Sequence, residues 1–472
     1  MSRAVEWVET VLERGTASSG VADALGLWRT ALADERPAMP SFDPTTEPCP
    51  EGGWIWPVGA GATPAPGGGA ALARAAKEAE ADVIAIYGDE VSLASDRATL
   101  LAKPCFDPVL LKSKDYLGWT VAFRASALAD DDLAALRAGA RPAEILRKRI
   151  EAGDIADVGG RIGHLPYPII ASRAAERGAP EDAPAICDAP MIDVVIPNRD
   201  SPGLIQRALR GLLDETDYPN LTVTVVDNGS EDPRTLSEYA QRESDPRFRA
   251  DIRAEPFNFA KMVNRGAAAG NAPLILLLNN DVEMPSSDWL RRMAAAMADP
   301  GIGVVGAKLL FPDLTIQHAG VIVGHGGVAG HDLKAAPRDF DDALGRMSAR
   351  HCRSAVTAAA MLIRRDLWRD LGGFDGDAFP VAFNDVDFCL RAWAAGASVA
   401  MAPDAELIHH EGKSRKKGWS LSRYLRHRRE RANLRARHGT LGMVDRFENP
   451  WRDHDALIPV YRRPAGEPRL RY

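Results

Sequence analysis

The stretch Ala272-Pro-Leu-Ile-Leu-Leu-Leu-Asn-Asn-Asp-Val-Glu-Met284 changes from apolar to polar in a single step. Its first part, Pro273 to Leu278, is continuously apolar, which is typical of a strand buried on both faces of a sheet. Polar residues follow where that strand would end, namely Asn279, Asn280, Asp281 and Glu283. In open α/β sheets, ligands bind beyond the carboxyl ends of the strands. The stretch therefore predicts a strand that delivers Asp281 to a ligand site, although a polar turn closing a core strand has the same pattern.

The segments before this stretch alternate between short apolar runs and amphipathic runs. Strands are expected at 192–197, 221–226 and 247–253, and helices at 202–213 and 258–269. This alternation predicts an α/β fold with a Rossmann-like, mostly parallel sheet flanked by helices. Glycine-rich phosphate-binding fingerprints do not follow these strands, which disfavours a dehydrogenase or a nucleoside triphosphatase.

Composition indicates a soluble globular protein of two or three domains. The 472 residues carry a net charge of -7, with 46% hydrophobic and 26% charged residues, so there is no overall bias toward nucleic acid. Five scattered cysteines without metal-binding spacing favour a reducing compartment. No apolar run approaches the roughly 20 residues that span a bilayer, and the N-terminus lacks a signal-peptide core. We therefore expect a cytoplasmic location, at most peripheral to the inner face of the cell membrane.

Three patterns in the first part of the chain recur later in the same order. An apolar strand at 82–87 ending in an acidic turn at 88–91 repeats the pattern of the stretch quoted above. Two further pairs match, 117–126 with 356–365 and 161–170 with 398–407. These echoes predict an internal duplication. The expected domains are a smaller degenerate α/β copy at 1–173, a linker at 174–190, a second domain at 191–415, and a basic helix and tail at 416–472.

Four motifs occur in the order seen in family 2 glycosyltransferases of the GT-A fold. They are Ile196–Asp200, Val225–Ser230, Asn279–Asp281 and Phe383–Phe388, and the resemblance covers residues 190–415. The segments Gln317–Gly320 and Gly326–His331 resemble the branch that builds bacterial surface polysaccharides, including O-antigen and rhamnan-type chains. The resemblance implies an inverting enzyme that uses a nucleotide-sugar donor, a divalent cation (Mn²⁺ or Mg²⁺) and a glycan or lipid-diphosphate-linked acceptor.

The resemblance also implies roles for individual residues. The donor would contact Pro197, Arg199, Asp227, Asn258, Asn264, Asn280 and Asp281. The cation would bind Asp281 and His409 together with Asn279, which stands where many relatives have Asp but also offers a hard oxygen ligand. Asp227 would accept the N3–H of uracil or thymine, which favours a UDP- or dTDP-sugar. The structural alternative for Asp227 is a turn former or helix cap.

Asp385 is the expected catalytic base. It begins a predicted helix at 384–393, where the helix dipole also favours an acidic residue for purely structural reasons. Contacts to the acceptor or the diphosphate are expected from Asp387, His410, Lys413 and Arg415. His318, His325 and His331 are interpreted as loop or acceptor-contact residues.

The C-terminal region is strongly basic. From Lys413 to Arg437 there are eleven basic residues and one acid, Glu430. The basic loop at 411–418 is interpreted either as a lid that closes over a diphosphate or as a solvated charge run. The basic helix with interleaved apolar residues that follows is typical of a membrane-surface contact or an anionic ligand site, and a nucleic-acid patch has the same pattern. No nucleic-acid-reading motif accompanies it.

The first copy lacks the residues that chemistry would need, since Pro142 stands where the catalytic aspartate is expected. Two rival functions remain at this point. One is a catalytically inactive sugar- or lipid-binding scaffold, and the other is a nucleotidyltransferase, for which Asn198–Gly203 is a poor phosphate loop.

Overall fold

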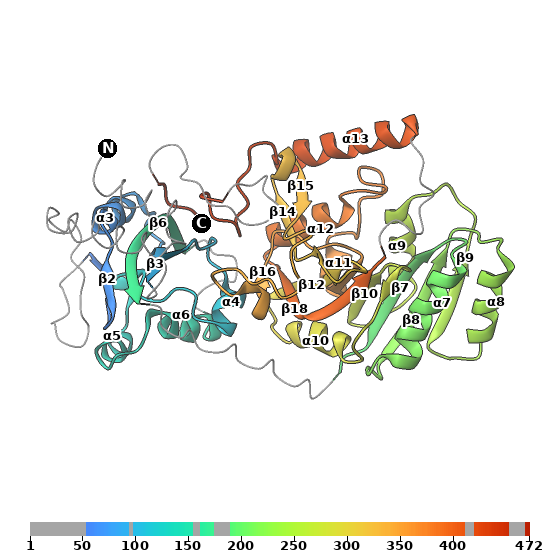
Figure 1. The fold of residues 1–472 in the computed structure, drawn as a ribbon, viewed down its shortest axis with the longest axis horizontal. Helices are drawn as coiled ribbons and strands as arrows, with labels where there is room; N and C mark the ends of the chain where they lie inside the picture. Colours follow the sequence, from blue (N-terminus) through green and yellow to red (C-terminus); the bar gives the residue numbers. More distant parts are fainter. Residues whose placement is uncertain (1–52, 94–97, 154–160, 174–188, 411–419, 453–467) are drawn as a thin grey trace.

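The computed structural model describes residues 53–93, 98–153, 161–173, 189–410, 420–452 and 468–472 (Figure 1). The start of the predicted first copy, most of the predicted linker, and the basic loop at 411–418 lie outside the described residues.

The larger sheet has the predicted α/β architecture. Its main path is β18 (Ser398–His409), β12 (Ile302–Leu310), β17 (Ala360–Arg364), β10 (Leu274–Leu278), β7 (Ile192–Asn198), β8 (Leu221–Asp227) and β9 (Phe248–Ile252). Of these seven strands only β17 runs against its neighbours, so the expected mostly parallel sheet is confirmed. Every residue of β10 is buried, as its continuous apolar run predicts.

Helices cover both faces of this sheet. They are α7 (Pro202–Arg210), α8 (Pro233–Arg242), α9 (Phe259–Ala268), α10 (Trp289–Ala296), α11 (Arg365–Asp370) and α12 (Asn384–Ala394). Figure 1 shows α12 above and α10 below the same half of the sheet. Because β7, β8 and β10 run parallel, their carboxyl ends meet at one edge of the sheet, where the polar motifs of the sequence lie.

The smaller sheet reproduces part of the larger one. It contains β1 (Trp54–Ile55), β2 (Ala62–Pro64), β3 (Ala85–Leu93), β4 (Ala98–Leu101), β5 (Val121–Arg124) and β6 (Ile162–Arg173). Strand β3 is antiparallel to β5 and parallel to β6, just as β12 is antiparallel to β17 and parallel to β18. Helices α3 (Gly68–Glu78) and α6 (Pro142–Glu151) precede β3 and β6, as α10 and α12 precede β12 and β18.

Two details of the predicted repeat are wrong. The strand that β3 matches in topology is β12, not the strand at 274–278. The acidic turn expected at 88–91 does not exist, because β3 continues through it to Leu93. The strand can continue because its two acids have buried partners. Asp89 Oδ1 lies 3.0 Å from His164 Nε2, and Glu90 Oε2 lies 3.6 Å from Lys103 Nζ.

The C-terminal segment joins the two units. Asn449 Nδ2 donates to both carboxylate oxygens of Asp89 at 3.0 Å, and Trp451 Nε1 donates to the Pro166 carbonyl at 2.8 Å. A salt bridge of 2.6 Å between Lys112 and Asp299 links the units directly.

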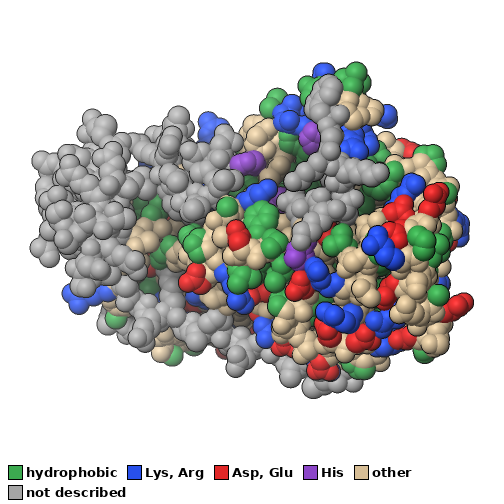
Figure 2. Space-filling view, turned by 45° about the vertical axis from the view of Figure 1, so that its right-hand side comes forward, with side chains coloured by type: hydrophobic (Ala, Val, Ile, Leu, Met, Phe, Trp, Pro, Cys, Tyr) green, Lys and Arg blue, Asp and Glu red, His purple; other side chains and the backbone are tan. Residues whose placement is uncertain are grey.

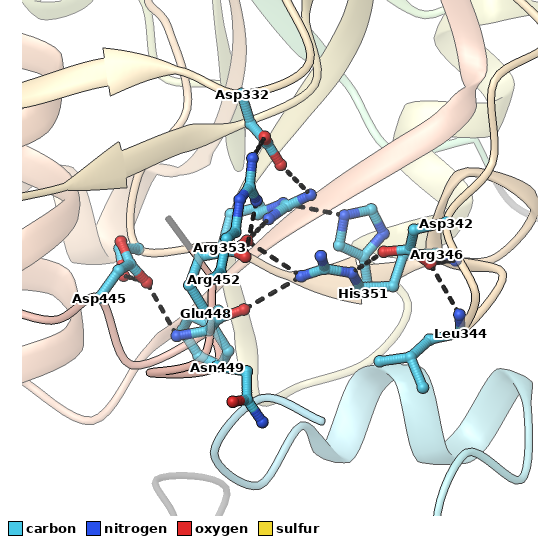
Figure 3. A network of polar contacts seen from close by, with 12 residues as sticks. Asp332, Asp342, Leu344, Arg346, His351, Arg353, Asp445, Glu448, Asn449 and Arg452 are labelled. Atoms are coloured by element: carbon cyan, nitrogen blue, oxygen red, sulfur yellow. Dashed lines mark hydrogen bonds and ion pairs between the residues drawn. The ribbon is translucent and has the colours of Figure 1, made fainter. Parts of the chain in front are cut away.

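A buried cluster of charges anchors the same segment (Figure 3). Glu448 lies 2.6 Å from Arg353 and 2.6 Å from Arg452, and Arg452 also reaches Asp332 at 2.6 Å. Burial alone would raise the pKa of the Glu448 carboxyl, but the guanidinium groups of Arg346, Arg452 and Arg353 hold that pKa well below its usual range. The cluster thus ties the C-terminal segment to the loop that carries Asp332.

In the part of the chain that the structure describes, no helix combines the length and the apolar composition needed to cross a bilayer.

Candidate active site

The short strand β11 (Val282–Glu283) brings the acidic end of the opening stretch to the end of β18. It pairs antiparallel with β18, with Val282 opposite His409. Asp281 Oδ1 consequently lies 3.1 Å from His409 Nε2, and the His410 amide donates to the Asp281 carbonyl at 2.9 Å. Asn279 Nδ2 lies 3.4 Å from the same His409 nitrogen. The three residues expected to hold a cation are therefore brought together.

Gln317, on β13 (Ile316–His318), fixes the orientation of His409. Its Nε2 donates to the His409 carbonyl at 3.2 Å, which leaves its Oε1 to accept from His409 Nδ1 at 2.7 Å. A neutral His409 then carries its proton on Nδ1 and presents the Nε2 lone pair to Asp281. Two lone pairs 3.1 Å apart repel unless a proton or a cation lies between them. This donor set fits a divalent cation.

The protein supplies few other ligands. Within the described residues, no three Asp, Glu, His or Cys side chains gather in a metal-binding arrangement. A cation at Asp281 and His409 would take Asn279 as its third protein ligand, and the remaining positions would be filled by water or by diphosphate oxygens, as Mg²⁺ sites commonly are.

Replacing Gln317 by Leu is expected to weaken Mn²⁺ binding by about 10–100-fold, the usual cost of losing a partner that orients a ligating histidine. The reason is that His409 loses the acceptor that places its proton on Nδ1. Titration calorimetry with Mn²⁺ measures the affinity without requiring turnover. Exchanging Gln241, which is exposed on α8, for Leu provides the control, and an unchanged affinity in the Gln317 variant would contradict this role.

Asp385 lies at the start of α12, as predicted, and faces a pocket of about 250 Å³ that Asn279 and His331 also line. Its Oδ2 accepts from the Ala358 amide at 3.1 Å and its Oδ1 from the Val386 amide at 2.9 Å. Both contacts fix the carboxylate in one orientation. Among the described residues lining this pocket, Asp385 is the one carboxylate.

One wall of the pocket is formed by a histidine pair. His331 lines the pocket, and its Nδ1 lies 2.7 Å from Nδ1 of the buried His318. Burial, with His331 and Arg353 nearby, holds the pKa of His318 well below its ordinary value, so His318 is neutral. The contact of His331 with an acceptor stays a prediction.

A buried polar network connects the strand ends on the donor side. Asn280 Nδ2 donates to Asn198 Oδ1 at 2.6 Å, and Asn198 Nδ2 donates to the Tyr239 hydroxyl at 2.6 Å. Asp227 accepts from the Ser230 amide and hydroxyl, both at 2.6 Å, and from Tyr239 at 2.7 Å. These bonds orient the fully buried Asp227 carboxylate, and its Oδ1, which accepts from the Ser230 amide, keeps a second lone pair that could accept a nucleobase N–H.

Two residues expected to touch the donor have other partners. Asn258 caps α9 and donates to the Gly376 carbonyl at 2.8 Å, while Asn264 exchanges hydrogen bonds of 2.8 and 3.0 Å with the Phe374 backbone. Their amides hold the 374–376 segment instead of lining the pocket. Pro197 lies at the end of β7 as predicted, and Arg199 is exposed beside Asp200.

The residues expected to contact the acceptor also lie in different surroundings. Asp387 is completely buried, and its carboxylate binds Arg391 at 2.8 Å and both Arg437 and His438 at 2.9 Å, so it cannot contact an acceptor as arranged here. His410 lies 3.0 Å from Glu283. Lys413 and Arg415 are outside the described residues.

Sequence reasoning did not find Gln317, Tyr239 or Ser230 as parts of the site. Gln317 precedes His318 within a quoted motif, but nothing in its position signals a contact with a histidine 92 residues away. Tyr239 lies on the buried face of α8 and resembles an ordinary core residue.

Comparisons with known proteins show which family the chain resembles. The profile of the family described as "Glycosyltransferase like family 2" matches residues 189–432, more than half of the chain. An uncharacterized protein of Sinorhizobium fredii, y4gI, is 38% identical over 273 residues, covering 58% of this chain. The O-antigen biosynthesis protein RfbC of Myxococcus xanthus is 31% identical over 382 residues, covering 72% of this chain. The chain spans only 29% of the length of each of these relatives.

Among solved structures, a mannosyltransferase from Pyrobaculum calidifontis in complex with GDP-Man and Mn²⁺ is similar at 19% identity and a TM-score of 0.41. The match covers 57% of this chain and 69% of that one. The family profile and the ordered motifs together identify the chain as a member of the family 2 glycosyltransferases.

Proposed function

We propose that the protein transfers a sugar, with inversion, from a UDP- or dTDP-sugar to a growing cell-surface polysaccharide or a lipid-linked acceptor. The observation that carries this proposal is the arrangement of the pocket. Its described lining includes a single carboxylate, Asp385, and also Asn279, which lies next to the Asp281 and His409 pair. The relation to an O-antigen biosynthesis protein supports the class of acceptor.

The chemistry assigned to Asp385 is that of a general base. Its carboxylate takes the proton from an acceptor hydroxyl while that oxygen forms a bond to the anomeric carbon of the donor. The bond from that carbon to the diphosphate breaks at the same time, and the nucleoside diphosphate leaves. Because no second carboxylate lines the described pocket to form a covalent intermediate, one displacement with inversion is the expected course.

The divalent cation, Mn²⁺ or Mg²⁺, would be held by Asp281 and His409 with Asn279. When bound, it would act as a Lewis acid on the leaving diphosphate. Asn280 and Asn198 would form the floor beneath the donor, and Arg199 would lie at its edge.

The acceptor side is proposed to approach a membrane. Helix α13 (Leu421–His438) exposes Leu421, Tyr424 and Leu425 together with Arg428 and Arg429 in its N-terminal half. Figure 2 shows hydrophobic and basic side chains together along the top of the molecule, where Figure 1 places α13. Such a surface suits peripheral contact with anionic lipid.

Co-sedimentation with phosphatidylglycerol vesicles tests this contact, and an absence of co-sedimentation at low salt would refute it.

The first unit is proposed to be a degenerate, non-catalytic copy. Its residues Asp89 and Glu90 are buried, and the fully buried Lys103 ammonium lies among them, donating to the Leu117 carbonyl at 2.8 Å. Pro142 begins α6 at the position equivalent to the start of α12. These buried contacts occupy Asp89 and Glu90, so neither is available as a base, which supports a structural role.

Donor turnover tests the proposed function. Purified protein is expected to hydrolyse one UDP- or dTDP-sugar slowly with Mn²⁺ or Mg²⁺ present, and to lose this activity with chelator or on changing Asp281 to Ala, because the leaving diphosphate needs the cation. The nucleoside diphosphate released is measured across UDP-, dTDP- and GDP-sugars. Changing the exposed Asp366 to Ala is the control. Turnover that is unaffected by chelator would contradict the metal-assisted mechanism.

A further inference from the structure

Helix α13 lies along the segment 375–387, which leads into α12 and Asp385. Asn433 Nδ2 donates to the Ala378 carbonyl at 2.9 Å, and Arg437 pairs with Asp375 at 2.7 Å. Arg437 also reaches Asp387 at 2.9 Å. Much of the positive charge in the C-terminal half of the helix is therefore paired with other groups of the protein.

Glu430 is the single acidic residue of this arginine-rich helix, and it is 1% exposed. Its Oε1 accepts from the Val381 amide at 2.8 Å and from the Ala382 amide at 3.1 Å. Burying a carboxylate is costly unless its hydrogen bonds compensate. Glu430 Oε2 lies 4.0 Å from Nε of Arg426, one turn earlier on the helix, so this ion pair and the two backbone contacts together compensate for the burial.

The backbone that Glu430 holds is a wall of the pocket. Val381, Ala382 and Phe383 all line it, together with Asp385. Phe383 adopts a left-handed backbone with φ of 62°, which is unfavourable for a bulky residue and persists only where its surroundings impose it. Its ring stacks on His427 of α13 at 5.5 Å between centroids. The helix thus fixes the turn from which α12 begins.

We propose that Glu430 is a positioning residue that sets the location of Asp385 through the backbone of Val381 and Ala382. The proposal rests on the proposed function insofar as Asp385 is the base. The basic helix accordingly has a role inside the active site in addition to its exposed end.

A purely stabilising role is the competing explanation, and substitutions at Glu430 separate the two. Gln retains an oxygen that can accept from both amides, whereas Ala removes it. If Glu430 positions the base, Glu430→Ala lowers kcat while leaving the affinity for nucleotide intact. If it only stabilises the fold, kcat and nucleotide binding decline together with the folded fraction.

The experiment measures three quantities in the full-length protein for Glu430→Ala, Glu430→Gln and the control Glu243→Ala, which removes an exposed glutamate just after α8. These are kcat for hydrolysis of the donor that the wild type turns over, the Kd for UDP and dTDP with Mn²⁺, and hydrogen exchange at the amides of 381 and 382. We expect kcat of Glu430→Ala to fall about 10²-fold, because a displacement of a catalytic group by about 1 Å typically costs this much. The Kd for nucleotide should stay within about 2-fold of wild type, and the amides of residues 381 and 382 should exchange faster. Glu430→Gln and Glu243→Ala should remain close to wild type.

Three results would overturn the proposal: an unchanged kcat in Glu430→Ala, a loss of nucleotide affinity in proportion to kcat, or a Glu430→Gln variant as impaired as Glu430→Ala. A wild type that neither binds nucleotide nor hydrolyses any donor would instead contradict the proposed function. In that case the exchange rates at 381 and 382 still decide whether Glu430 holds this backbone.

Discussion

Replacing Asp385 by Asn is expected to lower sugar transfer by about 10²–10⁴-fold, the range lost when a general base is removed. Asn has nearly the same shape, so α12 and its contact with the Ala358 amide can persist, but it cannot take a proton from the acceptor. The affinity for UDP or dTDP should stay within about 2-fold of wild type, because the loss is confined to the transition state. The rate of nucleoside diphosphate release measures the effect.

Asp366→Asn is the matched control for this substitution. Asp366 also lies in the first turn of a helix, α11, but it is exposed and outside the pocket. If Asp385 served only to complement the helix dipole, both variants would lose a few tenths of a kcal/mol of stability at most and keep their activity. Equal activity in the two variants would therefore refute the base assignment.

Replacing Glu448 by Ala is expected to lower the free energy of unfolding by about 3–5 kcal/mol. The substitution would leave the buried Arg353 and Arg452 sharing one carboxylate, Asp332, so their positive charge would no longer be balanced, and an uncompensated buried charge is strongly destabilising. Urea denaturation measures the change. Glu243→Ala, at an exposed position after α8, should stay within about 0.5 kcal/mol of wild type. A loss below about 1 kcal/mol for Glu448→Ala would contradict the importance of the cluster.

The same carboxylate predicts a dependence of stability on pH. The folded-state pKa of Glu448 is held well below its unfolded value, which is about 4.3. The stability it contributes is therefore fully present above that unfolded pKa and is lost as the pH falls toward the folded one. Glu448→Gln should accordingly show a smaller loss of stability than wild type between neutral pH and about pH 3, in acid unfolding followed by fluorescence.

The elements that the sequence predicted well are those set by local patterns. The apolar run before Asn279 is β10, and the acidic residues after Phe383 begin α12. The polar residues that follow three predicted strands also lie at one edge of the sheet, because parallel strands have their carboxyl ends at the same edge.

The elements that could not be predicted depend on contacts between distant residues. Arg353 and Glu448 are 95 residues apart, and Gln317 and His409 are 92 apart, so no local spacing brings them together. Asp387 was expected to contact the acceptor because it is two residues from Asp385, but Arg437 and His438 of α13 bind its carboxylate. The repeat was assigned to the wrong strand because β3, β10 and β12 are all buried apolar runs, and only strand order distinguishes them.

The most direct measurement for the central claim is calorimetric titration of the protein with UDP, dTDP and GDP in the presence of Mn²⁺. We expect UDP or dTDP to bind, and we expect binding to weaken on removal of Mn²⁺ and in Asp281→Ala. Asp385→Asn should bind as tightly as wild type. A protein that binds none of the three nucleotides, with or without Mn²⁺, would contradict the proposed function and favour an inactive scaffold.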